Sequence, residues 1–246
     1  MSQELINIQF LIKELDRFTP CVFLREARRQ QENFQQMTKL VVKIVLTARS
    51  HFVYERQQKV IEALLFAAEK HRGIYRKDEY TPYLLHVLEV VCILIDLGVF
   101  DYKVIVAAII HDVVEDTDAT KKEVSRRFGN TIARIVELLT KHPNFIRKWG
   151  YWIFIRNERD KNIKWRVIAI KFADRIHNLM TLSSMPEQKK AAKIRETLEE
   201  FPALYKVFIK TLHQLKNDGV VTKEHYMLLP FHLNNRLIYE IGRYTS

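Results

Sequence analysis

Apolar residues recur at intervals of three and four along almost the whole chain, and no segment alternates apolar and polar residues with the period of a strand. The pattern predicts an all-α protein. Only 6 glycines and 6 prolines occur in 246 residues, which also favours helices. With 48% hydrophobic residues, a chain of this length can bury one substantial core and a small appendage.

The first 55 residues are predicted to form an N-terminal helical extension of a main domain. An amphipathic helix is expected over residues 3–18, and the apolar face of a second helix follows it. That face consists of Phe34, Met37, Val41, Ile44, Val45 and Ala48. Such stripes usually pack into a core; contact with a partner or a second copy of the chain through residues 1–55 is the alternative.

Capping signals and apolar spacing divide the main domain, residues 56–201, into a series of helices. The predicted helices cover residues 56–71, 82–98, 101–115, 120–129, 131–141, 145–159, 163–182 and 186–198. Asp101 and Thr120 are the expected N-caps of two of them. Residues 202–246 are predicted to form a C-terminal helical extension packed on this domain, with a break at 217–219.

Several classes of protein are disfavoured by simple features of the chain. The longest apolar run, residues 104–110, is far shorter than the roughly 20 residues that a membrane helix needs. The N-terminus lacks the basic-then-apolar pattern of a signal peptide, so we expect a cytoplasmic protein with no membrane contact. Cys21 and Cys92 lie far apart in apolar contexts, which predicts buried free thiols.

The net charge of +11 is unevenly distributed along the chain. Acidic residues dominate between residues 86 and 120, where Lys103 is the lone cation, and basic residues outnumber acidic ones between residues 141 and 216. An acidic strip suits a metal, and a basic segment suits a ligand with several phosphates, although charge alone favours a solvated helix face for the basic segment. A nucleic-acid partner is the weaker interpretation of this charge.

The segment AAIIHDVVEDTD, residues 107–118, places a histidine and several carboxylates at the end of an apolar run. Glu115 and Asp116 would occupy the last turn of the predicted helix, where each opposes the helix dipole by roughly 0.3 to 1 kcal/mol. A bound cation is the simplest compensation. Asp101 and Asp118, at the edges of this region, are interpreted as caps or surface residues.

Two imidazoles and two carboxylates from three predicted helices form a candidate metal site: His86, His111, Asp112 and Asp174. Mixed nitrogen and oxygen ligands suit Mn²⁺ or Fe²⁺ better than Ca²⁺ or a thiolate-rich structural zinc site. Taken alone, His86 could be a core histidine, and Asp174 could pair with Lys171 or Arg175.

The order and spacing of these residues resemble the HD metal-dependent phosphohydrolase superfamily, and HDVVEDT resembles the motif of the RelA/SpoT-type (p)ppGpp hydrolases. Further similar stretches are HRGIYRKDEYTPYLLH (71–86), EVSRRFGNTIARIVELLTK (123–141), KFADRIHNLMTL (171–182) and RETLEEF (195–201). The resemblance covers residues from about 56 to 201 and implies an HD-domain helical bundle.

The resemblance also implies a role for each matching residue. It implies metal ligands at His86, His111, Asp112 and Asp174, with Mn²⁺ as the expected ion and Fe²⁺ or Co²⁺ as alternatives. It implies hydrolytic residues at Glu115 and Asp116. It also implies guanine and phosphate contacts at Arg76 and Lys77, and a nucleoside pocket at Asn178 and Thr181. Helical spacing independently places Asp174, Asn178 and Thr181 on one face.

The expected function is hydrolysis of a small nucleotide, ppGpp or pppGpp, at its 3′-pyrophosphate, giving GDP or GTP and pyrophosphate. The family resembled includes antitoxins that remove the product of a toxic alarmone synthetase. The loop at residues 78–81 departs from the bifunctional enzymes and is more similar to the stand-alone small alarmone hydrolases. Hydrolysis of ppApp or an NADPH-like nucleotide is therefore an alternative, and a degenerate nucleotide- or RNA-binding module is another.

Overall fold

The computed structural model describes residues 10, 13, 24–140, 152–219 and 225–245. Within these residues the elements are helices joined by loops, and the strand-type pairing is limited to one isolated bridge between Tyr75 and Pro82, so the predicted all-α class is confirmed. Most of the helix predicted over residues 3–18, residues 145–151 of the one predicted over 145–159, and Cys21 lie outside the described residues.

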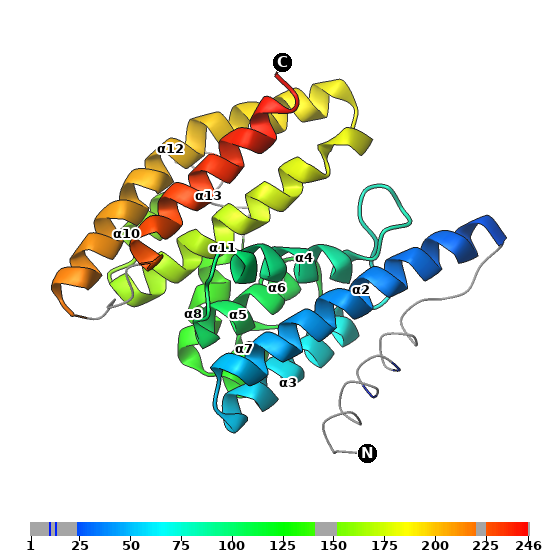
Figure 1. The fold of residues 1–246 in the computed structure, drawn as a ribbon, viewed down its shortest axis with the longest axis horizontal. Helices are drawn as coiled ribbons and strands as arrows, with labels where there is room; N and C mark the ends of the chain where they lie inside the picture. The colour runs from blue at the N-terminus through cyan, green and yellow to red at the C-terminus, as the bar shows by residue number, and fades with distance from the viewer. Residues whose placement is uncertain (1–9, 11–12, 14–23, 141–151, 220–224, 246) are drawn as a thin grey trace.

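The chain contains long helices at both ends and shorter ones between them (Figure 1). The described elements are α2 (Leu24–His51), α3 (Tyr54–Lys70), α4 (Tyr83–Asp96), α5 (Tyr102–Ile109), α6 (Val113–Asp116), α7 (Lys121–Phe128), α8 (Asn130–Leu139), α10 (Trp152–Asn157), α11 (Lys161–Met180), the 3-10 turn η1 (Leu182–Ser184), α12 (Glu187–Asn217) and α13 (His225–Gly242).

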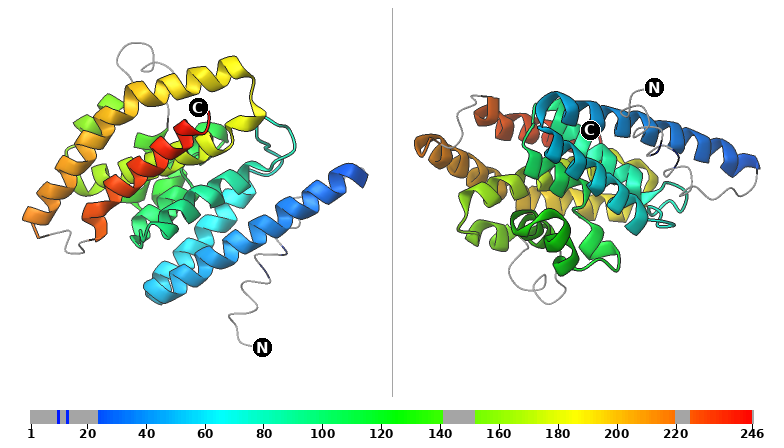
Figure 2. Two further views of the ribbon diagram at one scale, coloured as in Figure 1. Left: turned by 45° about the horizontal axis from the view of Figure 1, so that its top comes forward. Right: turned by 90° about the horizontal axis from the view of Figure 1, so that it is seen from below.

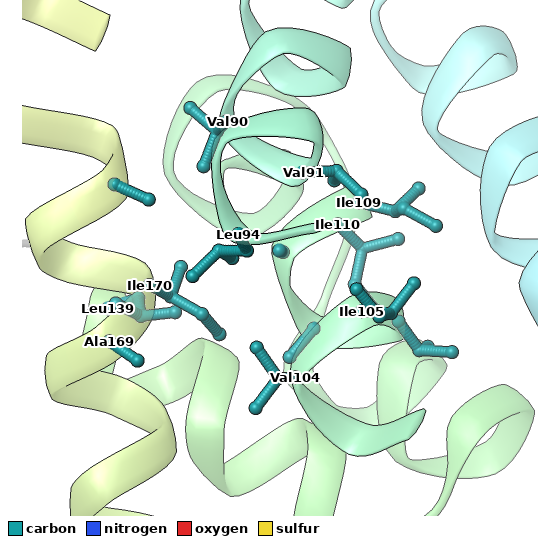
Figure 3. Close-up of a cluster of buried hydrophobic side chains, with 14 of the residues drawn as sticks. Val90, Val91, Leu94, Val104, Ile105, Ile109, Ile110, Leu139, Ala169 and Ile170 are labelled. Carbon is teal, nitrogen blue, oxygen red and sulfur yellow. The ribbon is translucent and has the colours of Figure 1, made fainter. Parts of the chain in front are cut away.

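The helices α4, α5 and α11 form the centre of the core, because most of their residues are buried. Aliphatic side chains from α4, α5, α8 and α11 meet there and interdigitate (Figure 3). Val90, Val104, Ile109 and Ile170 are each fully buried. In a closely packed core the loss of even one methylene group is destabilising. This core therefore holds the ends of α4, α5 and α11 in fixed relative positions.

The outer helices cover this core from two sides. The pair α2 and α3 lies on one side, and α12 and α13 lie on the other, where both pack on α11 (Figure 1 and Figure 2, left). Met37, Val41, Ile44 and Ala48 of α2 are each at most 2% exposed, so the predicted core face of that helix is confirmed. No helix within the described ranges is long and apolar enough to cross a membrane.

Three local predictions are also confirmed. Asp101 caps α5 by accepting a hydrogen bond from the Val104 amide (3.0 Å), and Thr120 caps α7 by accepting one from the Glu123 amide (3.2 Å). Cys92 is a buried free thiol whose pKa is raised to about 12 by burial.

The single helix predicted over residues 101–115 is wrong, because the chain forms two helices with a break between them. The last turn of α5 ends at Ile110, whose φ of −115° leaves the helical range, and α6 begins only at Val113. Glu115 and Asp116 therefore lie in a separate single turn of helix rather than at the end of a long one. The predicted conflict with the dipole of a long helix does not arise, because a single turn aligns few peptide dipoles.

The helix predicted to end at residue 198 is also longer than expected. It continues through Pro202 to Asn217 as α12. Phe201 and Phe208 pack against Phe172 of α11, at ring-centroid distances of 4.9 and 6.2 Å, so tertiary packing outweighs the helix-breaking tendency of proline. The division of the chain at residues 55 and 201 stays a prediction.

Candidate functional site

The break between α5 and α6 brings four predicted metal ligands to one point. His86 comes from α4, His111 and Asp112 from the break itself, and Asp174 from α11. Oδ2 of Asp112 lies 3.0 Å from Nε2 of His111 and 3.6 Å from Nε2 of His86. Nε2 of His86 also lies 3.4 Å from Oδ1 of Asp174. Adjacent residues of a regular helix would point about 100° apart, so the break is what lets His111 and Asp112 converge.

The chemistry of these side chains fits a divalent metal. One donor atom each from His86, His111 and Asp112 lies within 4.8 Å of the others. His111 bonds through Nδ1 to the Ala108 carbonyl at 2.9 Å, which leaves its buried Nε2 beside Asp112 but outside hydrogen-bonding geometry. Ligand atoms that lie close together without hydrogen-bonding to one another can share a bound cation. A mixture of nitrogen and oxygen ligands is typical of transition metals.

The electrostatics of the site favour positive charge. Burial acts to lower the pKa of His111, but the neighbouring Asp112 carboxylate outweighs it and raises that pKa to about 9. Burial acts to raise the pKa of Asp174, but Lys171 and His86 hold it well below its ordinary value. Two carboxylates that stay ionised among buried imidazoles stabilise a cation.

His177 is a neighbour of the site that the motifs alone leave without a role. Its Nδ1 lies 2.7 Å from Nδ1 of His86. Burial is the main cause that lowers the pKa of His177 to about 2, so this ring is neutral at physiological pH. Its spacing of three residues from Asp174 on α11 was the available signal, because residues three apart share a helix face.

Tyr83 is a second such neighbour. Its hydroxyl donates a hydrogen bond to Oδ2 of Asp112 at 2.6 Å and also interacts with Asp116. Desolvation and the charge of Asp112 raise the pKa of Asp116 above its ordinary value, against the opposing effect of the Tyr83 hydroxyl. Tyr83 thus links a predicted metal ligand to a predicted hydrolytic residue.

A cavity of about 480 Å³ opens beside these ligands. This volume falls in the range of roughly 300 to 1,000 Å³ that is typical of small-molecule sites. Its acidic part contains Asp112, Glu115, Asp116, Asp174 and Glu196, and its basic part contains Arg76, Lys77, Lys171, Lys189 and Lys193. A cavity with both signs of charge suits a cation together with an anionic ligand.

The predicted substrate residues take different positions around this cavity. Asn178 donates to Oδ1 of Asp174 at 2.6 Å and accepts from Arg76 at 2.9 Å, so a chain of hydrogen bonds joins Arg76 to a metal ligand. The Thr181 hydroxyl donates to the His177 and Asn178 carbonyls and lines a second cavity of about 260 Å³. Lys77 lines both cavities.

The ion pairs show which of the two predicted basic neighbours, Lys171 or Arg175, lies beside Asp174. Lys171 lies 3.5 Å from Oδ2 of Asp174, as one interpretation of the sequence predicted. Arg175 instead pairs with Glu196 at 2.7 Å and donates to the Thr197 hydroxyl at 3.2 Å. It therefore joins α11 to α12.

The two acidic residues set aside in the sequence lie away from the cluster. Asp101 caps α5 and pairs with Arg166 at 2.7 Å. Asp118 is 85% exposed and pairs with Lys70 at 2.9 Å. Their predicted roles as a cap and a surface residue are confirmed.

Comparison with known proteins agrees with this description. The family model described as HD domain matches residues 63–205. The guanosine-3′,5′-bis(diphosphate) 3′-pyrophosphohydrolase of Aquifex aeolicus is 35% identical over 164 residues, which are 63% of this chain and 22% of that protein. The bifunctional (p)ppGpp synthase/hydrolase SpoT of Escherichia coli K12 is 35% identical over 60% of this chain and 21% of its own length. The chain thus spans about a fifth of these curated relatives.

This chain is similar to a solved structure over nearly the whole length of that structure. That structure is described as a metazoan ortholog of SpoT that hydrolyses ppGpp and plays a role in starvation responses. The match has a TM-score of 0.52 and 27% identity, and covers 72% of this chain and 94% of that one. The resemblance to RelA/SpoT-type HD proteins that the motifs predict is thereby confirmed.

Proposed function

Since the chain belongs to the HD-domain family, we propose that it is a divalent-metal-dependent hydrolase that removes the 3′-pyrophosphate from ppGpp or pppGpp. The observation that carries this proposal is the convergence of His86, His111 and Asp112, with Asp174 3.4 Å from His86, at a cavity lined by both acidic and basic residues. The names of the Aquifex and Escherichia relatives and of the metazoan structure support the same substrate.

The metal would be held by His86, His111, Asp112 and Asp174. Mn²⁺ is the ion we propose, with Fe²⁺ or Co²⁺ served by similar ligands. When bound, a divalent ion supplies Lewis-acid chemistry, lowering the pKa of water and offsetting phosphate charge.

The protein's own residues bind and orient the substrate. Arg76 and Lys77 stand where the two cavities meet, so they can neutralise the phosphates while the nucleoside extends into the second cavity beside Thr181. Lys171, beside Asp174, adds a further cation to the lining of the first cavity. Charges fixed in advance around a phosphate stabilise the transition state without further reorganisation.

Glu115 and Asp116 would handle the proton of the attacking water. Both line the cavity one turn after the ligand pair His111 and Asp112. Water attacks the phosphorus, the bond to the 3′-oxygen breaks, and the leaving oxygen takes up a proton. A positioned carboxylate is typically worth about 10² to 10⁴ in rate as a general acid or base.

The test is a Mn²⁺-dependent pyrophosphate-release assay on ppGpp, with ppApp and NADPH as alternative substrates. The double substitution Glu115→Gln and Asp116→Asn should reduce turnover by about 100-fold or more while Mn²⁺ binding, measured by calorimetry, is retained. Asp118→Asn, on the exposed surface two residues away, is the matched control and should leave turnover unchanged. Full turnover in the double variant would refute the assignment of these carboxylates.

A cell that contains a toxic alarmone synthetase would be protected by this activity, and we include that antitoxin role in the proposal. Co-expression should restore growth to cells that produce such a synthetase, and the double variant should not. Toxicity relieved equally by the inactive variant would contradict a hydrolytic antitoxin.

A further inference from the structure

The second cavity has a polar wall that the HD motifs do not include. Glu89 of α4 lies on this wall three residues after His86, so both face the same side of the helix. Gln36 of α2 donates a side-chain hydrogen bond to Oε1 of Glu89. Gln36 lies outside residues 63–205, the part of the chain that matches the family model.

From this pair we infer that Glu89, oriented by Gln36, selects guanine over adenine in the bound nucleotide. The inference rests on the proposed function, because that function places the nucleoside in the second cavity. It adds a residue that determines base specificity, contributed by α4 and supported by α2.

The chemistry of the purine edge supports this choice. Guanine presents two neighbouring donors, N1–H and the N2 amino group, and a carboxylate can accept from both. Adenine presents an unprotonated N1, whose lone pair would face the negative charge of Glu89. A carboxylate oxygen has two lone pairs, so the bond from Gln36 leaves acceptor capacity on Glu89. Hydrogen bonds to a charged acceptor are roughly twice as strong as neutral ones.

The order of residues along α4 suits a nucleotide. Glu89 lies about one helical turn beyond His86, which is at the candidate metal. A nucleotide with its 3′-phosphate at the metal can therefore extend its base along the cavity towards Glu89. Leu85 and Met185 also line the second cavity and provide apolar surface against which a purine face can pack.

Helix α2 holds this wall and the neighbouring loop together. Asn33 donates to the Tyr80 carbonyl at 3.3 Å, and the Arg29 guanidinium lies 4.9 Å from the centroid of the Tyr80 ring. Asn33 and Gln36 both line the second cavity, as do Arg76 and Lys77 of the same loop. The hydrogen bond from Gln36 restrains the Glu89 acceptor, and a restrained acceptor discriminates between bases better than one that can turn away.

The test measures binding as well as turnover. Calorimetry with GDP and ADP should give at least about 10-fold tighter binding of GDP to the unaltered protein, the expected value of one hydrogen bond to a charged group. Glu89→Gln should lower the affinity for GDP by about 10- to 100-fold and should change the affinity for ADP little. Pyrophosphate release from ppGpp and ppApp should show the same loss of selectivity, mainly in KM.

Asp96→Asn is the matched control. Asp96 lies two turns further along α4 and pairs with Lys43 of α2, so the variant removes the same charge from the same helix pair outside the cavity. It should keep the preference for guanine. Gln36→Ala, at an exposed position, gives a second variant whose folding is secure, and it should reduce the preference several-fold.

The outcomes separate the two proposals. Equal binding of GDP and ADP to the unaltered protein, or an unchanged preference in both Glu89→Gln and Gln36→Ala, overturns the inference even if ppGpp is hydrolysed. A preference for GDP that Glu89→Gln removes, together with no release of pyrophosphate from ppGpp, supports the inference and rejects the proposed hydrolysis.

Discussion

The contact between His86 and His177 decides which nitrogen of His86 is offered to a metal. The two Nδ1 atoms lie 2.7 Å apart, so one of them carries a proton and the other accepts it. If Nε2 of His86 binds the cation, the proton of the neutral ring lies on Nδ1 and is donated to His177. His177 then acts as an acceptor that fixes both the tautomer and the orientation of His86.

Substitution of His177 should therefore weaken metal binding. We expect His177→Ala to lower Mn²⁺ affinity by about 10- to 100-fold, the usual effect of losing a hydrogen-bond partner of a ligating histidine. His177→Asn should recover much of that loss, because its side-chain oxygen can accept at the position of Nδ1. Calorimetric titration of each variant with Mn²⁺ measures the effect without an activity assay.

The control for this prediction is His213→Ala, which removes an exposed histidine from α12. Its Mn²⁺ affinity should equal that of the unaltered protein. If His177→Ala binds Mn²⁺ with unchanged affinity, the contact between the imidazoles does not position His86.

Individual site residues could be predicted from the sequence only where a short motif carries them. His111 and Asp112 stand next to each other, and Asp174 is an acid in an apolar helix, so each is noticeable by itself. His177 and Tyr83 are ordinary core residues by composition. Apart from the spacing of His177 from Asp174, their role comes from α4 packing against α11 and the α5–α6 break, which are tertiary contacts.

Among the helices, the break after α5 has the largest consequence for the site. Residues 104–110 are uniformly apolar and contain no glycine or proline, so the sequence offers no reason to end the helix there. Ile110 and Val113, on either side of the break, are both fully buried, so the break lies within the packed core. Tertiary packing thus overrides local propensity where the ligands converge.

Helix α5, which ends just before His111, is joined to α11 by a contact at the start of α5. Asp101 caps α5 and pairs with Arg166 of α11, and both groups are largely buried. We expect Asp101→Ala to lower the free energy of unfolding by roughly 1 to 3 kcal/mol, from the lost cap and the unpaired guanidinium. Asp101→Asn keeps a capping oxygen and should lose less. Urea unfolding followed by circular dichroism measures both changes, and equal stability of the two variants would contradict a capping role.

The link between α11 and α12 should depend on pH. Burial alone would raise the pKa of Glu196, but Arg175, together with Lys193, outweighs it and lowers that pKa to about 2. A carboxyl whose pKa is lower in the folded state stabilises the fold above its unfolded pKa, near 4.5, and this contribution is lost as pH falls towards 2. The extra stability of the unaltered protein over Glu196→Gln should therefore be constant above about pH 6 and shrink towards pH 3.

Urea unfolding of both proteins at several pH values tests this dependence. Glu199→Gln is the control, since Glu199 is an exposed residue of the same helix. A difference between the unaltered protein and Glu196→Gln that stays constant down to pH 3 would show that Arg175 does not lower the pKa of Glu196.

At the scale of the whole molecule, folding brings the acidic and basic parts of the chain to one cavity. The sequence predicts the two parts and their complementary uses, but it cannot tell a ligand-binding basic segment from a solvated helix face. In the fold, Lys189 and Lys193 at the start of α12 line the cavity that contains Asp112 and Asp174. Gln36 of α2 reaches the second cavity in the same way, although its sequence context marks it only as a polar residue of an amphipathic helix.

Only some of the basic residues of α12 line the cavity. Substitutions along this helix should therefore distinguish lysines that bind the nucleotide from lysines on a solvated face. We expect Lys189→Ala to raise the KM for ppGpp several-fold with little change in kcat, because a partly exposed cation interacts with phosphate by roughly 1 kcal/mol or less. Lys206→Ala, an exposed lysine of the same helix outside the cavity, has the same effect on net charge and should leave the KM unchanged. Raising the salt concentration should reduce the difference between unaltered protein and Lys189→Ala, since screening weakens exposed charge pairs first. Equal effects of the two substitutions in steady-state kinetics would mean that the net charge of +11 attracts the nucleotide as a whole and that α12 provides no specific contact.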